Sequence, residues 1–295
     1  MVRGTAKATG ISAPKLALLS MDVEDWYHLE YFQRQRETEP SMLDGVERFA
    51  DVLASERVPA TFFVVGDVAR SHPATILSLI GSGHEIASHG PDHQLVTLMP
   101  VDHFVRQLAE HKDALEQQFG VPIRGYRAPC FSMNGEKVRR LPEIGFTYDS
   151  SWIRFNSHPL YVHMDVSDWP DVCEGVRRAP GHDFVEFEVP TASLGRMRLP
   201  FSGGGYFRIF PWALLRRLTT RYLEHARVYV FFIHPFECSR RQLDAFPPGT
   251  SMSNRVRFQM GRSRTLSRVT RLVRLLRREG WEFSTFSAAR ERLLA

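Results

Sequence analysis

Two histidines four residues apart, His89 and His93, stand at the ends of the sequence His-Gly-Pro-Asp-His. On a helical turn this spacing points both imidazoles to one side. Upstream, an apolar run ends in the acidic residues Asp22, Glu24 and Asp25. One carboxylate and two histidines form a common ligand set for a hydrolytic metal ion that keeps one coordination position open for water. These residue types therefore predict metal-assisted hydrolysis.

The acidic cluster has two roles to fill, because one carboxylate would bind the metal and another would take a proton from the attacking water. Alternation along a strand places Asp22 and Glu24 on the same face and leaves Asp25 just beyond the strand end. The spacing alone leaves open which pair of carboxylates does this work.

Two further residues stand where a hydrolase needs them. Arg127 precedes Ala-Pro, and an arginine beside catalytic carboxylates would keep a base ionised and oriented. His234 follows six nearly all apolar residues and so leaves a buried strand at its mouth, a setting that suits a general acid. A surface ion pair for Arg127 and a core histidine for His234 are the simpler alternatives.

Short apolar runs alternate with amphipathic segments, which predicts parallel strands joined by helical crossovers. The expected strands are 16–21, 60–65, 85–88, 125–127, 146–148, 184–189, 228–233 and 281–283. The expected helices are 43–56, 73–82, 101–119, 135–143, 211–225 and 266–278. In a parallel barrel the carboxyl ends of the strands meet at one face, so the distant polar residues would converge there.

Length and composition favour a soluble globular protein, with 295 residues, 43% apolar and 24% charged. We expect a flexible tail over 1–15 and a single domain over 16–295. The tail lacks the apolar core of a signal peptide, and the three widely spaced cysteines suit reduced thiols, so we expect a cytoplasmic protein.

The C-terminal half contains two irregular, loop-like segments, about 155–200 and 240–264. Between them, three glycines precede Tyr206 and Phe207, a loop that could let a sugar approach the backbone. Nine arginines and no acidic residue lie between Arg255 and Arg278. This excess could attract an anionic lipid surface or nucleic acid, or form a solvated helix face whose apolar stripe packs on the barrel.

The order of these motifs resembles the NodB-homology polysaccharide deacetylases, carbohydrate esterase family 4. Five family motifs have counterparts in the right order: Ser20–Asp25, Ser88–His93, Arg127–Pro129, Tyr148–Trp152 and Ile233–Pro235. The C-terminal part is similar to an extension found on deacetylases associated with bacterial exopolysaccharide biosynthesis, with family-specific loops in about 155–295.

The resemblance implies a distorted (β/α) barrel of about seven parallel strands that removes the acetyl group from an N-acetylated sugar, with one divalent metal ion, for which we expect zinc. It implies the metal ligands Asp25, His89 and His93, with Glu24 as the alternative to Asp25. It implies the catalytic residues Asp22 as base, His234 as acid, Arg127 holding the base, and Asp149 orienting Arg127 or His234. Substrate contacts are expected from Pro129, from a backbone N–H near Cys130 for the oxyanion, and from Trp152 and Tyr206.

Two alternatives differ in chemistry. One is a metal-independent hydrolase of cyclic amides, as in the allantoinase branch, whose histidines would bind substrate. The other is a non-enzymatic module that binds nucleic acid or a membrane surface through Arg255–Arg278. We favour the enzyme without a nucleic-acid partner, although peripheral membrane contact through that segment is compatible with it. The sequence carries no signal for the oligomeric state.

Overall fold

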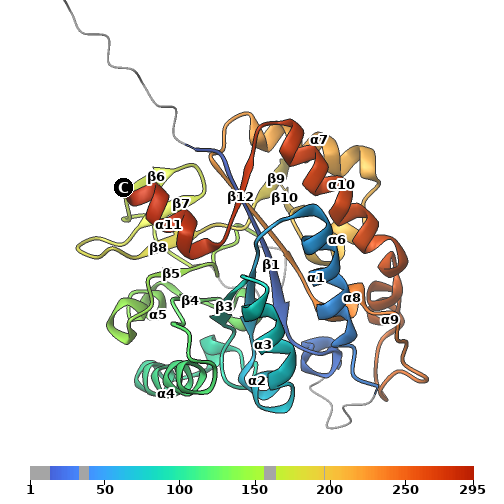
Figure 1. Cartoon of the computed structure of the whole chain (residues 1–295), viewed down its shortest axis with the longest axis horizontal. Coiled ribbons are helices and arrows are strands. Elements are labelled where there is room, and N and C mark those ends of the chain that lie inside the picture. The colour runs from blue at the N-terminus through green and yellow to red at the C-terminus, as the bar shows by residue number, and fades with distance from the viewer. Residues whose placement is uncertain (1–13, 33–39, 156–163, 196) are drawn as a thin grey trace, which may run out of the picture.

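The computed structural model describes residues 14–32, 40–155, 164–195 and 197–295. Its main sheet curls into an open half-barrel with the strand order β11-β1-β2-β3-β4-β5-β8-β7-β6, and β12 pairs with β1 (Figure 1). Every pairing from β11 to β8 is parallel, whereas β7 and β6 form an antiparallel extension. The strands are β1 Leu16–Val23, β2 Thr61–Val64, β3 Glu85–Ser88, β4 Gly125–Tyr126, β5 Tyr148–Asp149, β6 Asp171–Cys173, β7 Val176–Arg178, β8 Val185–Phe187, β11 Val228–Ile233 and β12 Glu282–Ser284.

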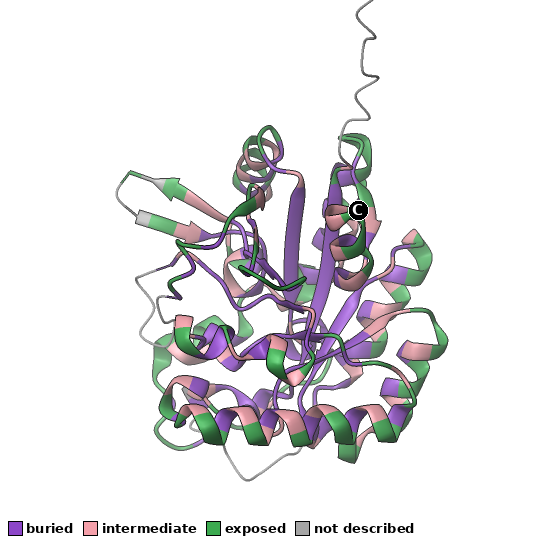
Figure 2. Cartoon of the chain, turned by 90° about the vertical axis from the view of Figure 1, so that its left-hand side faces the viewer, coloured by how far each residue is buried: buried purple, intermediate pink, exposed green. Residues whose placement is uncertain are grey.

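Helices cover the outer face of this sheet, as parallel crossovers require (Figure 1). They are α1 Asp44–Glu56, α2 Gly66–Ser71, α3 Pro73–Gly81, α4 Val101–Phe119, α5 Gly135–Val138, α6 Gly204–Ile209, α7 Trp212–Leu223, α8 Pro235–Cys238, α9 Met252–Gln259, α10 Thr265–Arg278 and α11 Phe286–Leu294. Figure 2 shows the strands buried at the centre and the helices exposed on their outer sides. All residues of β1 and β11 are buried, so these two neighbouring strands lie within the core.

The distorted parallel barrel expected from the sequence is confirmed, and each predicted strand and helix has a counterpart. Two segments predicted to be partly irregular contain more regular structure than the sequence indicated. The segment 155–200 contains the β6–β7 hairpin and a second hairpin, β9 Thr191–Leu194 with β10 Met197–Pro200, while 240–264 contains α9. Short hairpins and an eight-residue helix carry too little periodic pattern to distinguish them from loops. The tail prediction for 1–15 falls almost entirely outside the described residues.

The arginine-rich helix α10 packs its apolar stripe inward, with Val269, Val273 and Leu276 fully buried. Several of its arginines serve this packing. Arg274 and Arg277 both form ion pairs with Glu56 of α1. The stripe therefore faces the barrel rather than an external partner. In the part of the chain that the structure describes, no helix is both long enough and apolar enough to cross a bilayer.

Helix α1 packs closely against α8, the short helix that follows His234. A Cβ built on Gly45 of α1 would lie 1.9 Å from the carbonyl oxygen of Pro235. Only a residue without a side chain lets the two backbones approach this closely. The position of His234 therefore depends on a glycine more than 180 residues earlier in the chain.

We expect Gly45→Ala to lower the free energy of unfolding by about 1–3 kcal/mol or more, because the added methyl group overpacks the α1–α8 contact. Gly81→Ala is the matched control, since a Cβ there meets nothing within 4 Å and alanine favours the helix by up to about 1 kcal/mol. Urea unfolding of both variants gives the comparison. Equal stability of the two would contradict this packing.

Candidate active site

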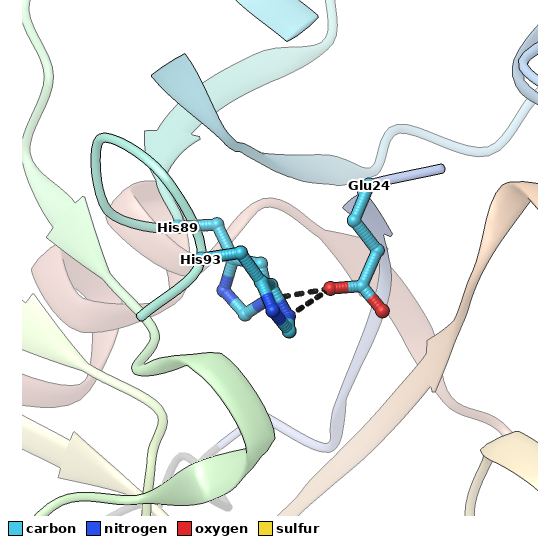
Figure 3. A group of neighbouring side chains, drawn as sticks. All are labelled: Glu24, His89 and His93. Atoms are coloured by element: carbon cyan, nitrogen blue, oxygen red, sulfur yellow. Dashed lines mark ion pairs between the residues drawn. The ribbon is translucent and has the colours of Figure 1, made fainter. Parts of the chain in front are cut away.

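Glu24, His89 and His93 meet at the carboxyl ends of β1 and β3 (Figure 3). Their ligand atoms all lie within 4.8 Å of one another, and all three residues are buried. The Nε2 atom of His89 is 3.5 Å from Oε2 of Glu24, and Nε2 of His93 forms a close ion pair with the same oxygen. Figure 3 shows both imidazoles directed at this carboxylate.

The two histidines lie on a loop, not on the helical turn that their spacing suggested. His93 adopts a left-handed backbone with φ of 58°, and Gly90 has φ of 82°. A non-glycine residue in this region is strained, and such strain is held where the surrounding structure requires it. Here the turn folds the loop back so that His93 comes beside His89.

This group fits a divalent cation. The Nδ1 atom of His89 lies 2.8 Å from the carbonyl oxygen of Arg127 and must donate its proton there, which leaves a lone pair on Nε2 facing Glu24. Oε2 of Glu24 has no hydrogen-bond partner of good geometry among the described residues. Burial raises the pKa of Glu24, but the surrounding histidines His93, His89 and His234 hold it well below its usual value. Acceptor atoms that face one another require a positive charge between them.

Asp25, the first choice for the metal carboxylate, lies outside this group. Its carboxylate accepts hydrogen bonds from the backbone N–H groups of Trp26 at 2.7 Å and Met42 at 2.9 Å and from the hydroxyl of Ser41 at 2.6 Å. It therefore caps the turn that follows β1. The expectation for Asp25 is corrected to its alternative, Glu24, because strand alternation turns Asp22 and Glu24 together into the site.

Asp22 and Arg127 form a buried ion pair between β1 and β4. Nη1 of Arg127 donates to Oδ1 of Asp22 at 2.7 Å and to the hydroxyl of Ser20 at 2.9 Å. Its Nε and Nη2 atoms donate to the carbonyl and hydroxyl oxygens of Ser150, both at 3.0 Å. The guanidinium also covers the ring of Phe63 at 4.0 Å. Arg127 thus holds the Asp22 carboxylate in one orientation, with Oδ2 left for the site.

His234 follows β11 and turns Nε2 toward the same carboxylates, 3.9 Å from Oδ2 of Asp22 and 3.7 Å from Oε1 of Glu24. Its Nδ1 lies 3.0 Å from Glu237, which also accepts from the backbone N–H of His234 at 2.9 Å. Burial lowers the pKa of His234, but its hydrogen bond to Glu237 and the charges of Glu237, Glu24 and Asp22 raise it to about 9. A protonated imidazole at neutral pH is ready to donate a proton.

Glu237 is a residue that the sequence analysis missed. It is fully buried and pairs closely with the buried Arg208 of α6. Burial raises the pKa of Glu237, but Arg208 and His234 lower it to about 2, so it stays ionised. The spacing of Glu237 three residues after His234 matches a capping box, which was a readable signal.

Asp149 was expected to orient Arg127 or His234, and the described structure shows no direct hydrogen bond to either. It instead accepts from the hydroxyl of Ser151 at 2.8 Å and shares a hydrogen bond with the buried Glu186. Its role is therefore corrected to holding the segment that carries Ser150 beneath Arg127, while Glu237 orients His234.

Asp149 and Glu186 carry more negative charge than their buried surroundings can compensate. Burial raises the pKa of Asp149 to about 6 and, together with the neighbouring Asp149 charge, raises that of Glu186 well above its usual value. Oε1 of Glu186 accepts from the backbone N–H groups of Ser151 at 3.1 Å and Trp152 at 3.0 Å. A protonated Glu186 that donates to Asp149 satisfies this pair.

The four expected substrate contacts lie in different settings. Pro129 is buried beside the histidine loop, since a Cβ on Gly90 would lie 3.8 Å from its Cγ. Cys130 is half-buried in a left-handed turn with φ of 52°, directly after the Arg127 segment. Tyr206 is half-buried on α6 against Phe155 and remains a predicted contact.

Trp152 is only 8% exposed, with the guanidinium groups of Arg177 and Arg154 at 4.9 and 5.4 Å from its ring. Flat sugar stacking needs an open ring face. The expectation that Trp152 lines a sugar groove is therefore corrected to packing within the core.

Comparison with known proteins finds two family models that match separate parts of this chain. Residues 40–148 match the family model described as polysaccharide deacetylase, and residues 151–289 match a domain of unknown function (DUF3473). Strands from both matched regions belong to one sheet, because β8, β11 and β12 lie in the sheet that contains β1 to β5. The second region also supplies His234, Glu237 and Arg208.

Curated relatives align over part of their length. A chitooligosaccharide deacetylase of Rhizobium leguminosarum bv. trifolii is 37% identical over 119 residues, which are 40% of this chain and 50% of that protein. A peptidoglycan deacetylase of Helicobacter pylori is 24% identical over 123 residues, 42% of each chain. The chain thus spans half or less of the length of these two relatives.

Solved structures share the fold over nearly the whole chain. A candidate polysaccharide deacetylase from Mycobacterium smegmatis has a TM-score of 0.60 and 21% identity, covering 100% of this chain and 95% of that one. A Bacillus anthracis protein described as a carbohydrate esterase family 4 pseudoenzyme has a TM-score of 0.53 and 12% identity, covering 95% and 66%. At these identities the likeness shows the fold alone.

The buried pair Asp149–Glu186 makes stability pH-dependent. Their raised pKa values mean that the folded state retains protons that the unfolded chain releases, so this contribution to stability is present below about pH 4 and is lost as the pH rises through 6 and above. Glu186→Gln keeps the acceptor for two N–H groups and supplies a permanent donor to Asp149. We expect urea unfolding to show the stability of this variant, relative to wild type, rising between pH 5 and pH 8.

Glu186→Ala is the control for this prediction. It leaves both backbone N–H groups without their acceptor and should lose about 1–3 kcal/mol at every pH. A constant difference between Glu186→Gln and wild type across the pH range would contradict a shared proton.

Proposed function

We propose that this protein is a metal-dependent hydrolase that removes the N-acetyl group from an acetamido sugar and releases acetate. The observation that carries the proposal is the placement of His234 within 4 Å of both Asp22 and Glu24, one of which belongs to the Glu24–His89–His93 group. A base, an acid and a cation ligand set therefore meet at one edge of the sheet.

In this proposal Glu24, His89 and His93 hold the divalent cation, with zinc as the expected ion because two imidazoles and a carboxylate suit it. The bound cation would polarise the acetamide carbonyl and favour ionisation of the attacking water. The carbonyl oxygen of Arg127 fixes the tautomer of His89, so the residue that holds the base also orients a ligand.

The proton transfers follow from the remaining groups. Asp22, held by Arg127, takes one proton from the attacking water while the water oxygen bonds to the carbonyl carbon. When the carbon–nitrogen bond breaks, His234 gives its proton to the departing sugar nitrogen. Glu237 stabilises the charged imidazole through Nδ1 and keeps Nε2 facing the site. Acetic acid and free amino sugar result. Transfer of the acetic acid proton to the amine gives acetate and the ammonium sugar, and transfer of the Asp22 proton to His234 restores the starting state.

The substrate class rests on the relatives, whose names point to chitooligosaccharides and peptidoglycan. Both contain acetamido sugars, so we propose that class for this chain. An exopolysaccharide or its precursor as the substrate, and a cytoplasmic location, are finer predictions that rest on the sequence resemblance.

Metal content tests which of two neighbouring carboxylates, Glu24 or Asp25, binds the ion. We expect Glu24→Gln to lose stoichiometric zinc and Asp25→Asn to retain it, because only Glu24 faces the histidines. Metal content of protein purified without chelator, measured by mass spectrometry, checks both. Zinc lost from Asp25→Asn alone would restore the first sequence assignment, and wild-type protein without any metal would favour the metal-independent hydrolase.

The catalytic roles predict loss of rate without loss of fold. We expect Asp22→Asn and His234→Ala to reduce kcat for acetate release from N-acetylglucosamine oligomers by about 10²–10⁴, the usual contribution of a proton-transfer group. Circular dichroism checks the fold, and Asp22→Asn should keep its zinc. His103→Ala, at an exposed histidine on α4, is the matched control. Wild-type turnover in either site variant would refute that residue's role.

A further inference from the structure

A pocket lies at the far end of α8 from His234. It has a volume of about 620 Å³ and lies among α1, the segment after Cys238, α9 and the turn at Arg262. Four arginines line it, Arg48, Arg240, Arg241 and Arg262, together with the rings of Phe246 and Phe258. None of these residues belongs to the proposed deacetylase site.

The hydrogen bonds of these arginines leave their charge uncompensated. Arg48 donates to the carbonyl oxygen of Cys238, Arg241 donates to that of Ser41 at 2.8 Å, and Arg262 donates to that of Arg241 at 2.6 Å. Backbone carbonyls orient a guanidinium but carry no net charge. Within residues 14–32, 40–155, 164–195 and 197–295, none of the four arginines forms an ion pair with a carboxylate.

Arg262 gives a second, independent sign of an anion site. Its Nε is buried and has no hydrogen-bond partner among the described residues. Burial and the nearby charge of Arg208 lower the pKa of Arg262, against the opposing effect of Asp44 and Glu237. Two carboxylates act on Arg262 from this side: Glu237, which is paired with Arg208, and Asp44, which accepts from the backbone N–H of Arg240 and the hydroxyl of Ser239. With Glu237 compensated by Arg208, Asp44 alone stands against the four arginines of the pocket, which leaves a surplus of about three positive charges.

The guanidinium groups that line the pocket indicate which kind of anion it would bind. Guanidinium forks match the oxygens of phosphate, and several forks around one cavity suit a group that carries more than one negative charge. The walls formed by Phe246 and Phe258 exclude water and strengthen such contacts. A volume of about 620 Å³ exceeds what a single phosphate fills and leaves space for the group attached to it.

We propose that this arginine pocket binds the diphosphate group of a ligand. The proposal goes beyond the deacetylase function and does not depend on it. A nucleotide and a lipid carrier can both present a diphosphate, so the shared chemistry is assigned to the pocket and its source is left to experiment.

The test is titration calorimetry of the full chain at 150 mM salt with three probes: inorganic diphosphate, uridine diphosphate and a short prenyl diphosphate. We expect saturable binding of inorganic diphosphate, weakened at least tenfold in the double variant Arg240→Ser/Arg241→Ser. Both residues are exposed, so the variant should fold, and circular dichroism checks this. Tighter binding of uridine diphosphate or of the prenyl compound supports the pocket and identifies the source.

Arg216→Ser/Arg217→Ser on α7 is the matched control, because it removes the same charge from an exposed pair outside the pocket. It should bind inorganic diphosphate within twofold of wild type. If diphosphate binding were weakened equally in both double variants, the loss would follow from net charge alone, and the proposal would be overturned. Absence of saturable binding to wild type would also overturn it. Neither result involves acetate release, so failure here is distinct from failure of the deacetylase assignment.

Discussion

The site depends on one buried cation, the guanidinium of Arg127. A buried charge is costly unless it is paired and its donors are satisfied, so β1, β4 and the segment after β5 must come together around it. Asp22 supplies the countercharge, Ser20 and Ser150 take the remaining donors, and the backbone carbonyl of Arg127 orients His89. Arg127 therefore couples the position of the Asp22 carboxylate to that of the His89 imidazole. A shift of any of the three elements would leave a buried donor or charge without its partner.

Local pattern and motif order predicted the parallel sheet and most of the candidate site. Buried strands leave apolar runs in the sequence, and the polar residues that follow these runs mark the strand ends. The choice of Asp25 over Glu24 came from the family resemblance, and the geometry does not support it. Strand alternation alone pairs Glu24 with Asp22, and the structure follows that physical rule. The helical turn expected for His89 and His93 failed for another reason, since glycine and proline between them favour a loop.

What the sequence could not predict are partners distant in the chain. Arg208 stands in a glycine-rich segment whose aromatic residues attracted attention, yet its role comes from Glu237, 29 residues later. Its other donors hold the carbonyl oxygens of Arg257 on α9 and of Met260 directly after it. The buried Arg208 therefore links α9 to α8, the short helix that follows His234. Such a contact leaves no periodic pattern in the sequence, because it depends on how two distant elements pack after folding.

The shared fold does not by itself decide whether the chemistry occurs. Among the structures with this fold is one described as a pseudoenzyme, so the overall likeness is compatible with activity and with its absence. The distinction has to come from side chains. In this chain Arg127 holds the carboxylate of Asp22 and Glu237 holds the imidazole of His234. The carbonyl oxygen of Arg127 accepts the Nδ1–H of His89 and so orients its Nε2 lone pair. Each reacting group thus has a partner that fixes its charge or orientation. Each of these buried arrangements costs free energy of folding, because charged and polar groups are removed from water. The proposed proton transfers would use all three, which would account for their retention at one sheet edge.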